Sequence, residues 1–188
     1  MLRDLILKNR SYRRFDQSVI ISEDALRELV DLGRLSASGA NLQCLKYMLA
    51  CDPAKNAAIF PTLRWAGYLK EWGGPQEGER PSAYIVILGD TRVSKNFGVD
   101  HGIAAQSILL GAVERGLGGC MIASIQREQL RQALAIPEQY EILLVLALGK
   151  PVEQVQLELV EADGSIQYWR DDQGVHHVPK RELKDVLL

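Results

Sequence analysis

The sequence predicts a single domain of mixed helices and strands. Its 188 residues suit one hydrophobic core, since cores usually divide only beyond about 250 residues. Helix-like and strand-like segments alternate along the chain without an internal repeat or a linker. Two continuous apolar runs, residues 83–88 and 142–148, are typical of strands buried on both faces of a sheet.

The first half of the chain offers clear helix signals. Residues 2–8 form a short amphipathic helix pattern, and residues 9–21 are polar, basic and irregular. Ser22 is a good N-cap for a helix that the small polar residues from Ser36 onward end, because such residues favour turns. We expect a strand at residues 46–51 and then a short helix from about Pro53.

In the second half, residues 64–81 are rich in glycine and proline and predict a lid-like excursion. Residues 100–115 predict a helix inside the protein, and residues 126–134 a shorter one. The tail, residues 152–188, predicts hairpins: strands near 155–160 and 166–170, with a turn at Asp163-Gly164 between them. Apolar positions in so long a tail need cover, and a partner subunit is the natural candidate.

Composition excludes several classes of protein. There are 22 basic and 24 acidic residues, a net charge of −2, which disfavours a globally basic nucleic-acid binder. The three cysteines lack the spacing of a disulfide framework or a zinc site. Residues 142–148 are the longest apolar run, too short to span a bilayer. We therefore expect a cytoplasmic protein without a membrane or nucleic-acid partner.

A basic cluster stands near the N-terminus. Residues 10–14 read Arg-Ser-Tyr-Arg-Arg, and this density of guanidinium and hydroxyl donors suits a phosphate. The alternative is a solvated basic loop, which is the commoner fate of short charge runs. A second basic pair, Lys180 and Arg181, lies near the other end of the chain, and chain termini often lie close together.

Two segments of small residues offer backbone groups to a ligand. In residues 36–43, small side chains let the main chain approach, while Asn41 and Gln43 add amides; an ordinary helix-to-strand loop is the alternative. Residues 116–119 read Gly-Leu-Gly-Gly, which lacks the spacing of a dinucleotide fingerprint. They predict a tight turn that places the backbone of residues 120–124 beside a flat ligand.

Other side chains are interpreted structurally. Cys120 has no catalytic partner recognisable in sequence, and free cysteine is commonly a small buried hydrophobe. His176 and His177 are adjacent, so on a strand they point to opposite faces and cannot easily share a metal ion. Asp100 is interpreted as a helix cap. We nominate no catalytic side chain and no metal ligand.

Taken together, these segments resemble the nitroreductase family of FMN-dependent oxidoreductases. The resemblance rests on five segments in the family's order: residues 10–15, 36–43, 100–106, 116–124 and 179–181. It implies an α+β fold of three αβα layers around a largely antiparallel sheet, with residues 1–188 forming one FMN-binding domain. It also implies an intertwined homodimer with FMN at the interface and the tail packed on the partner subunit.

The resemblance also implies site residues. It assigns Arg10, Ser11, Tyr12 and Arg13, with Lys180 and Arg181, to the phosphate and ribityl chain. It assigns Ala37, Ser38, Gly39 and Asn41 to a segment that the partner places against the flavin ring, although many relatives have proline where Ala37 stands. It places the backbone of Met121, Ile122, Ala123 and Ser124 at the ring's pyrimidine edge and N5. Arg64 and Trp65, in the lid-like excursion, are candidates for substrate contact.

The implied activity is transfer of a hydride from NADH or NADPH, through flavin N5, to nitroaromatic, quinone or similar acceptors by a ping-pong mechanism. Two alternatives stay open. One is a flavin-binding sensor or carrier with little turnover, and the other is a different flavin reaction such as reductive dehalogenation, because a fold fixes its chemistry less firmly than its architecture.

Overall fold

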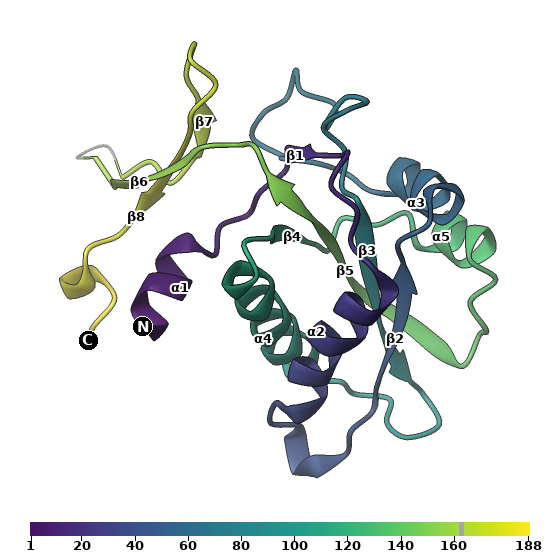
Figure 1. The fold of residues 1–188 in the computed structure, drawn as a ribbon. Helices are drawn as coiled ribbons and strands as arrows, with labels where there is room; N and C mark the ends of the chain where they lie inside the picture. The colour runs from purple at the N-terminus through teal and green to yellow at the C-terminus, as the bar shows by residue number, and fades with distance from the viewer. Residues whose placement is uncertain (162–163) are drawn as a thin grey trace.

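A computed structural model describes residues 1–161 and 164–188 of the chain. A five-stranded sheet lies between two pairs of helices (Figure 1). Its strands are β1 (Phe15–Asp16), β2 (Leu45–Ala50), β3 (Ala83–Asp90), β4 (Gly118–Ile122) and β5 (Tyr140–Pro151). All four strand pairings in this sheet are antiparallel. The expected α+β, three-layer architecture is therefore confirmed.

The long strand β5 organises the sheet. It pairs with β3 along one edge and with both β4 and β1 as well, and β2 continues the sheet beyond β3. Every residue of β3 is buried, as expected for a strand covered on both faces. Strand β4 starts at Gly118, inside the turn that the sequence predicts at residues 116–119, and Gly118–Ile122 pairs with β5 from Gly149 to Val145.

The helices cover both faces of the sheet. One face packs against α2 (Glu23–Leu35) and α4 (Asp100–Glu114), the other against α3 (Pro53–Ile59) and α5 (Arg127–Ala133). Alternate residues of β3 serve the two cores: Ile85 and Ile87 face α2 and α4, whereas Tyr84 and Val86 face the opposite layer. The sequence patterns for all four helices are confirmed within a residue or two.

Helix starts follow the capping rules in two cases and depart from them in a third. The Ser22 hydroxyl accepts a hydrogen bond from the Ala25 N–H, 3.2 Å away, so Ser22 caps α2 as expected. Asp52 caps α3 in the same way. The interpretation of Asp100 as a cap is wrong: Asp100 is the first residue inside α4, and its carboxylate binds residues before β2 instead.

Short helices and an irregular segment complete the domain. Helix α1 (Leu2–Lys8) stands at the N-terminus, and three single turns of 3-10 helix lie at Gly39–Asn41, Phe60–Thr62 and Leu183–Asp185. Residues 64–81 contain neither helix nor strand, in agreement with the predicted excursion.

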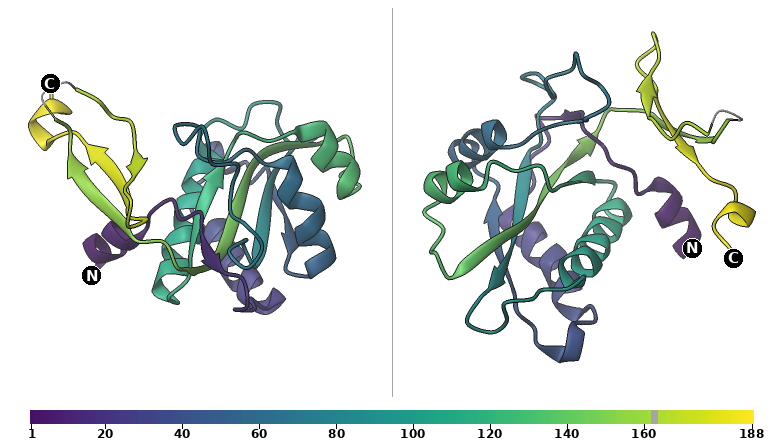
Figure 2. Two further views of the ribbon diagram at one scale, coloured as in Figure 1. Left: turned by 90° about the horizontal axis from the view of Figure 1, so that it is seen from above. Right: turned by 180° about the vertical axis from the view of Figure 1, so that it is seen from behind.

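The tail forms a small sheet of its own, which stands apart from the main sheet in both views of Figure 2. Its strands are β6 (Val155–Leu159), β7 (Trp169–Arg170) and β8 (His176–Lys180). Strands β7 and β8 pair antiparallel. The hairpin expected between β6 and β7 is wrong, because β6 pairs in parallel with β8. Alternating residues predict that a strand forms but not which strand it joins, and the predicted turn residues Ala162 and Asp163 lie outside the described residues.

His177 lies at the centre of the tail sheet. One ring nitrogen, Nδ1, lies 2.8 Å from a carboxylate oxygen of Glu158 on β6, and Nε2 lies 3.1 Å from a carboxylate oxygen of Asp171 in the β7–β8 turn. The ring stacks on Trp169 with centroids 4.9 Å apart. Hydrogen bonds to the Glu158 and Asp171 carboxylates raise the pKa of His177.

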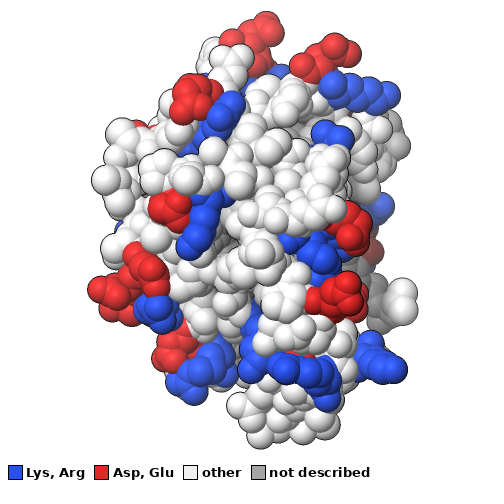
Figure 3. All heavy atoms as spheres, turned by 90° about the vertical axis from the view of Figure 1, so that its right-hand side faces the viewer, with Lys and Arg blue, Asp and Glu red and all other residues white. Residues whose placement is uncertain are grey.

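The surface mixes charges of both signs. On the face shown in Figure 3, basic and acidic side chains alternate without a broad patch of either sign. Among the described residues, no helix is long and apolar enough to cross a membrane.

Candidate functional site

The arm, residues 9–14, runs from α1 to β1 along the free edge of β4. It attaches there by a parallel bridge between Ser11 and Gly119, and the Tyr12 N–H donates to the Gly119 carbonyl oxygen over 3.0 Å. A Cβ at Gly119 would lie 2.5 Å from the Ala147 carbonyl oxygen, so only glycine lets the strands approach this closely. On the arm side, a Cβ at Gly118 would lie 2.6 Å from the Tyr12 ring, so the two glycines let β4 approach both β5 and the arm.

The arm meets the tail across a cavity of about 240 Å³, which we call the arm cavity. Three basic side chains from both ends of the chain line it, namely Arg10, Arg13 and Lys180. The rest of the lining is Asn9, Ser11, Val155, Tyr168, His176 and Val178. The two basic clusters that the sequence places far apart are thus brought together. Figure 1 shows the reason, since α1 and the tail lie on the same side of the molecule.

The cations of the arm cavity have no acidic partner. Within the described chain, no carboxylate lies at ion-pair distance from the charged groups of Arg10, Arg13 or Lys180. By contrast, the next arginine, Arg14, pairs with Glu79. One Arg10 nitrogen donates to the Ile6 carbonyl oxygen over 2.7 Å, while its Nε is buried without a partner. The arm cavity therefore carries unneutralised positive charge, which suits the binding of an anion.

A buried carboxylate holds the arm and tail together from below. The Glu153 side chain is inaccessible to solvent, accepts a hydrogen bond from the Arg13 N–H over 2.8 Å, and pairs with Arg170 over 2.6 Å. Arg170 also lies over the Trp72 ring, 4.7 Å from its centroid, which connects the tail to the 64–81 segment. Because the acid binds a main-chain N–H of the arm, the Arg13 side chain remains available to the cavity.

His176 lies beside Arg13, with its Nε2 3.4 Å from a guanidinium nitrogen and its Nδ1 buried without a partner. Burial lowers the pKa of His176, and the nearby Arg13 charge lowers it further, although Glu153 acts in the opposite direction. Near neutral pH, the imidazole is therefore an uncharged group in the wall of the arm cavity.

A second cavity of about 170 Å³, the edge cavity, adjoins the first and shares Arg13 and Tyr168 with it. The backbone of residues 121–124 forms one wall, and Arg64 and Trp65 of the 64–81 segment form another. The Ser124 carbonyl oxygen accepts from the Arg64 N–H over 3.0 Å, which joins the two walls. Tyr168 lies where the cavities meet, 5.1 Å below the Arg13 guanidinium and 4.9 Å from the Tyr68 ring.

Most of the expected site residues therefore converge on two adjoining cavities. Arg10, Ser11, Arg13 and Lys180 line the arm cavity, and residues 121–124 line the edge cavity with Arg64 and Trp65. Six expected residues line neither: Tyr12, Arg181 and the four of the 36–43 loop, Ala37, Ser38, Gly39 and Asn41. The Tyr12 hydroxyl donates to the Lys8 carbonyl oxygen, and Arg181 is exposed beyond β8. Burial raises the pKa of Tyr12.

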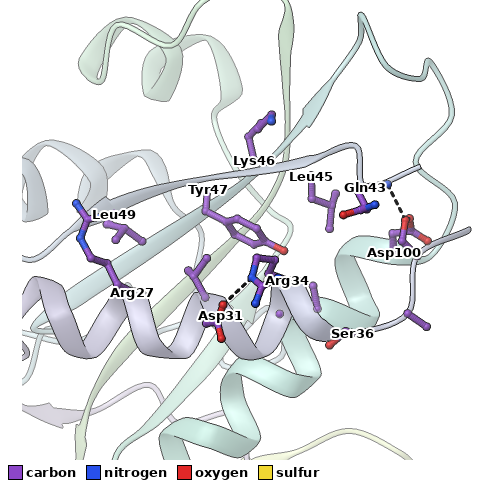
Figure 4. Close-up of a pocket in the computed structure, with 15 residues that line it drawn as sticks. Arg27, Asp31, Arg34, Ser36, Gln43, Leu45, Lys46, Tyr47, Leu49 and Asp100 are labelled. Carbon is purple, nitrogen blue, oxygen red and sulfur yellow. Dashed lines mark hydrogen bonds and ion pairs between the residues drawn. The ribbon is translucent and has the colours of Figure 1, made fainter. Parts of the chain in front are cut away.

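The loop of residues 36–43 lies elsewhere. Ala37 and Ser38 line a third cavity of about 490 Å³ between α2 and β2, shown in Figure 4. Gly39 and Asn41 are exposed. No residue of this loop lines the arm or edge cavity. Within one chain, the structure thus does not bring this expected ring-facing segment to the other site residues.

Sequence reasoning missed Asn9, Tyr168 and His176, which line the two cavities, and Glu153, which binds the Arg13 N–H of the arm. Tyr168 directly precedes the short strand β7 and His176 begins β8, and the sequence does not reveal how these tail strands pair. Glu153 follows β5 as an isolated acid in a polar stretch, so nothing local marks it as buried. The basic cluster of the arm needs an acid elsewhere in the chain to hold it in place. An isolated acid such as Glu153 was the one signal that the sequence offered for that role.

Among the described residues, no group of three or more histidine, cysteine, aspartate or glutamate side chains could hold a metal ion.

The model of the nitroreductase family matches residues 6–150. The chain belongs to the nitroreductase family. The matched range contains the arm, the 36–43 loop and residues 121–124, and it ends before the tail that supplies Lys180 and Tyr168.

This nitroreductase-family chain is 25% identical over 172 residues to a NADPH-flavin oxidoreductase of Vibrio harveyi, a match that covers 82% of this chain and 68% of the relative. Its fold is also that of an FMN-dependent nitroreductase from Clostridium difficile, with a TM-score of 0.66, 22% identity, and coverage of 80% of this chain and 87% of that one. A protein of Exiguobacterium sibiricum solved in complex with FMN has a TM-score of 0.67 at 17% identity, covering 81% of this chain and 89% of that one.

Proposed function

We propose that this chain is an NAD(P)H-dependent oxidoreductase that binds FMN in the adjoining arm and edge cavities. The observation that carries the proposal is the cluster of Arg10, Arg13 and Lys180, which have no acidic partner in the described chain and face a cavity continuous with the edge of β4. A phosphate suits the first cavity, because guanidinium groups bind it through paired hydrogen bonds. A flat ring suits the second, because its wall is a strand edge.

When bound, FMN would supply the redox chemistry for hydride transfer, through its N5, from NADH or NADPH to a nitroaromatic, quinone or similar acceptor in a ping-pong cycle. The residues of this chain bind the cofactor and orient it. The basic side chains of the arm cavity hold the phosphate, with Ser11 as a further donor. We assign to residues 121–124, which line the edge cavity, the backbone N–H donors that charge on the ring needs.

The walls of the edge cavity define the space left to a substrate. Arg64 and Trp65 lie opposite the strand, so we assign them to substrate contact. We nominate no side chain as an acid or base; the proton that accompanies the hydride in reducing a quinone or a nitro group would come from solvent. The 36–43 loop of a second copy, through Ala37, Ser38, Gly39 and Asn41, is proposed to complete the ring site in a homodimer.

The test replaces both arginines of the cluster. Arg10→Ala/Arg13→Ala is expected to yield folded protein with at least about 100-fold weaker FMN binding, since each lost charge-assisted bond costs about 1.5–3 kcal/mol. Dissociation constants are measured from the quenching of FMN fluorescence. Arg3→Ala/Lys8→Ala is the matched control, because it removes the same charge from exposed positions of α1 outside both cavities.

Unchanged FMN affinity in the arginine variant would contradict the phosphate assignment. Turnover is tested separately by stopped-flow mixing of the FMN-loaded protein with NADH or NADPH. Rapid bleaching of the flavin absorbance, followed by reoxidation with a quinone, is expected. If the bound flavin stays oxidised, the chain is a flavin carrier with little turnover.

A further inference from the structure

The 36–43 loop adopts an unusual backbone. Ala40, Asn41 and Gln43 have φ angles of 48°, 53° and 51°, in the left-handed region that side chains other than glycine's disfavour. All three residues are exposed, as is Leu42 between them. Nothing in the hydrophobic core requires this conformation, so the loop must be held by specific bonds.

Those bonds come from Asp100. Its carboxylate, at the first position of α4 and 8% exposed, accepts hydrogen bonds from the Ser38 hydroxyl over 2.8 Å and from the Gly39 N–H over 3.0 Å. The Ser38 hydroxyl oxygen in turn accepts from the Gln43 N–H over 3.0 Å. The chain of bonds from Asp100 through Ser38 to Gln43 thus brackets all three left-handed residues. Figure 4 shows Asp100 beside Gln43.

Asp100 is a buried acid with no basic partner in the described chain. Burial of a carboxylate is costly unless its charge is offset, and here loop donors and the N-terminal end of α4 offset it. An acid interpreted from sequence as a helix cap instead spans 62 positions to bind Ser38. A cap function would direct the carboxylate to amides of its own helix, which its bonds do not do.

We propose that Asp100 is a positioning residue, which fixes the 36–43 loop in the conformation in which it meets FMN held by a second copy of this chain. The inference rests on the proposed function, because the loop lines neither of the cavities assigned to FMN in its own chain. An exposed loop that Asp100 holds in this strained conformation is available to a molecule outside its own chain.

The first test needs no cofactor. In apoprotein carrying Asp100→Asn, the Gly39 and Gln43 amides are expected to exchange with deuterium at least about tenfold faster, while amides in the interior of α4 keep their protection. Ser38→Ala is expected to expose Gln43 in the same way. Asp24→Asn, the same change in the first turn of α2, is the control. Unchanged exchange at Gly39 overturns the proposed fixation whether or not the protein binds FMN.

The second test asks whether the fixation serves the flavin. Asp100→Asn is expected to weaken FMN binding at least about tenfold and to shift the visible flavin spectrum, because a charge-assisted bond is lost. Adding Ala40→Gly is expected to recover part of the affinity, since glycine adopts the left-handed conformation freely. Faster exchange with unchanged FMN affinity and spectrum would overturn the positioning role. Absence of FMN binding by the parent protein would instead refute the proposed function.

The third test assigns the loop to the partner. Differently tagged chains, one with Asp100→Asn and one with Arg10→Ala/Arg13→Ala, are purified as a mixed dimer. If the loop acts across the interface, the intact arginines of the first chain meet the intact loop of the second. One FMN per dimer then binds with the affinity of the parent protein. Weak binding at both sites, or a failure to form any dimer, would overturn action on a second copy.

Discussion

The buried acid Glu153 allows a sharp test of how the tail is held. Glu153→Ala removes a wholly buried carboxylate and leaves Arg170, whose side chain is 16% exposed, without its counter-charge. It also leaves the Arg13 N–H without its acceptor. Breaking a buried pair from one side costs about 3–5 kcal/mol, because the remaining charge stays desolvated. For a domain of this size, the melting temperature is expected to fall by roughly 6–20 °C, at about 2–4 °C per kcal/mol.

The assay is thermal denaturation followed by circular dichroism, with limited proteolysis to detect release of the tail. Glu28→Ala is the control, because it breaks an ion pair with Arg115 that is largely exposed and worth at most about 1 kcal/mol. Glu153→Gln, which keeps an acceptor for the Arg13 N–H, should lie between the two. If Glu153→Ala costs no more than Glu28→Ala, the tail does not depend on this pair and the reasoning fails.

Two further predictions concern the strand edge and the tail sheet. Gly119→Ala places a methyl group 2.5 Å from the Ala147 carbonyl oxygen, so we expect about 1–3 kcal/mol of destabilisation in thermal melts and weaker FMN binding. Gly102→Ala is the control and should be tolerated, because a Cβ at Gly102 would have no neighbour within 4 Å. His177 has a raised pKa, so its contribution to stability is complete below its unfolded pKa of about 6.5 and is lost as pH rises through the folded value. His177→Gln should therefore reduce the protection of the tail from proteolysis more at about pH 5.5 than at about pH 8.5. An equal loss at the two pH values would contradict this. The contribution of His176 to stability changes with pH in the opposite sense, because its pKa is lowered, but His176 is present in both the parent protein and the variant, so its effect cancels in the comparison.

Local rules predicted the elements of the fold well. Ser22 caps α2 because the bond lies within three residues, and the apolar run of β3 is buried on both faces because that composition suits no other place. Such local rules could not predict hydrogen bonds between residues that lie far apart in the sequence. Asp100 carries the signature of a cap, yet its partner lies 62 positions away. Neither the spacing nor the composition around an acid indicates so remote a donor.

In the candidate site, too, local sequence predicted some features and long-range pairing decided the others. Three arginines and a serine within five residues were sufficient to predict an anion site, since the density of donors is itself the chemical signal. The tail contributes Tyr168, directly before β7, and His176, at the start of β8, and alternation does not determine how β6 and β7 pair with β8. Residue type therefore predicted the basic lining of the cavity, while topology decided which other residues surround it.

The union of arm and tail also sets an order of events during synthesis. Arg13 and His176 touch across 163 positions of sequence, so a ribosome that has released the arm must still make nearly the whole chain before the cavity closes. Domains fold as their residues emerge, at about 5–20 residues per second, and the main sheet is complete once β5 has appeared. A nascent or truncated chain can therefore fold its core and still lack Lys180.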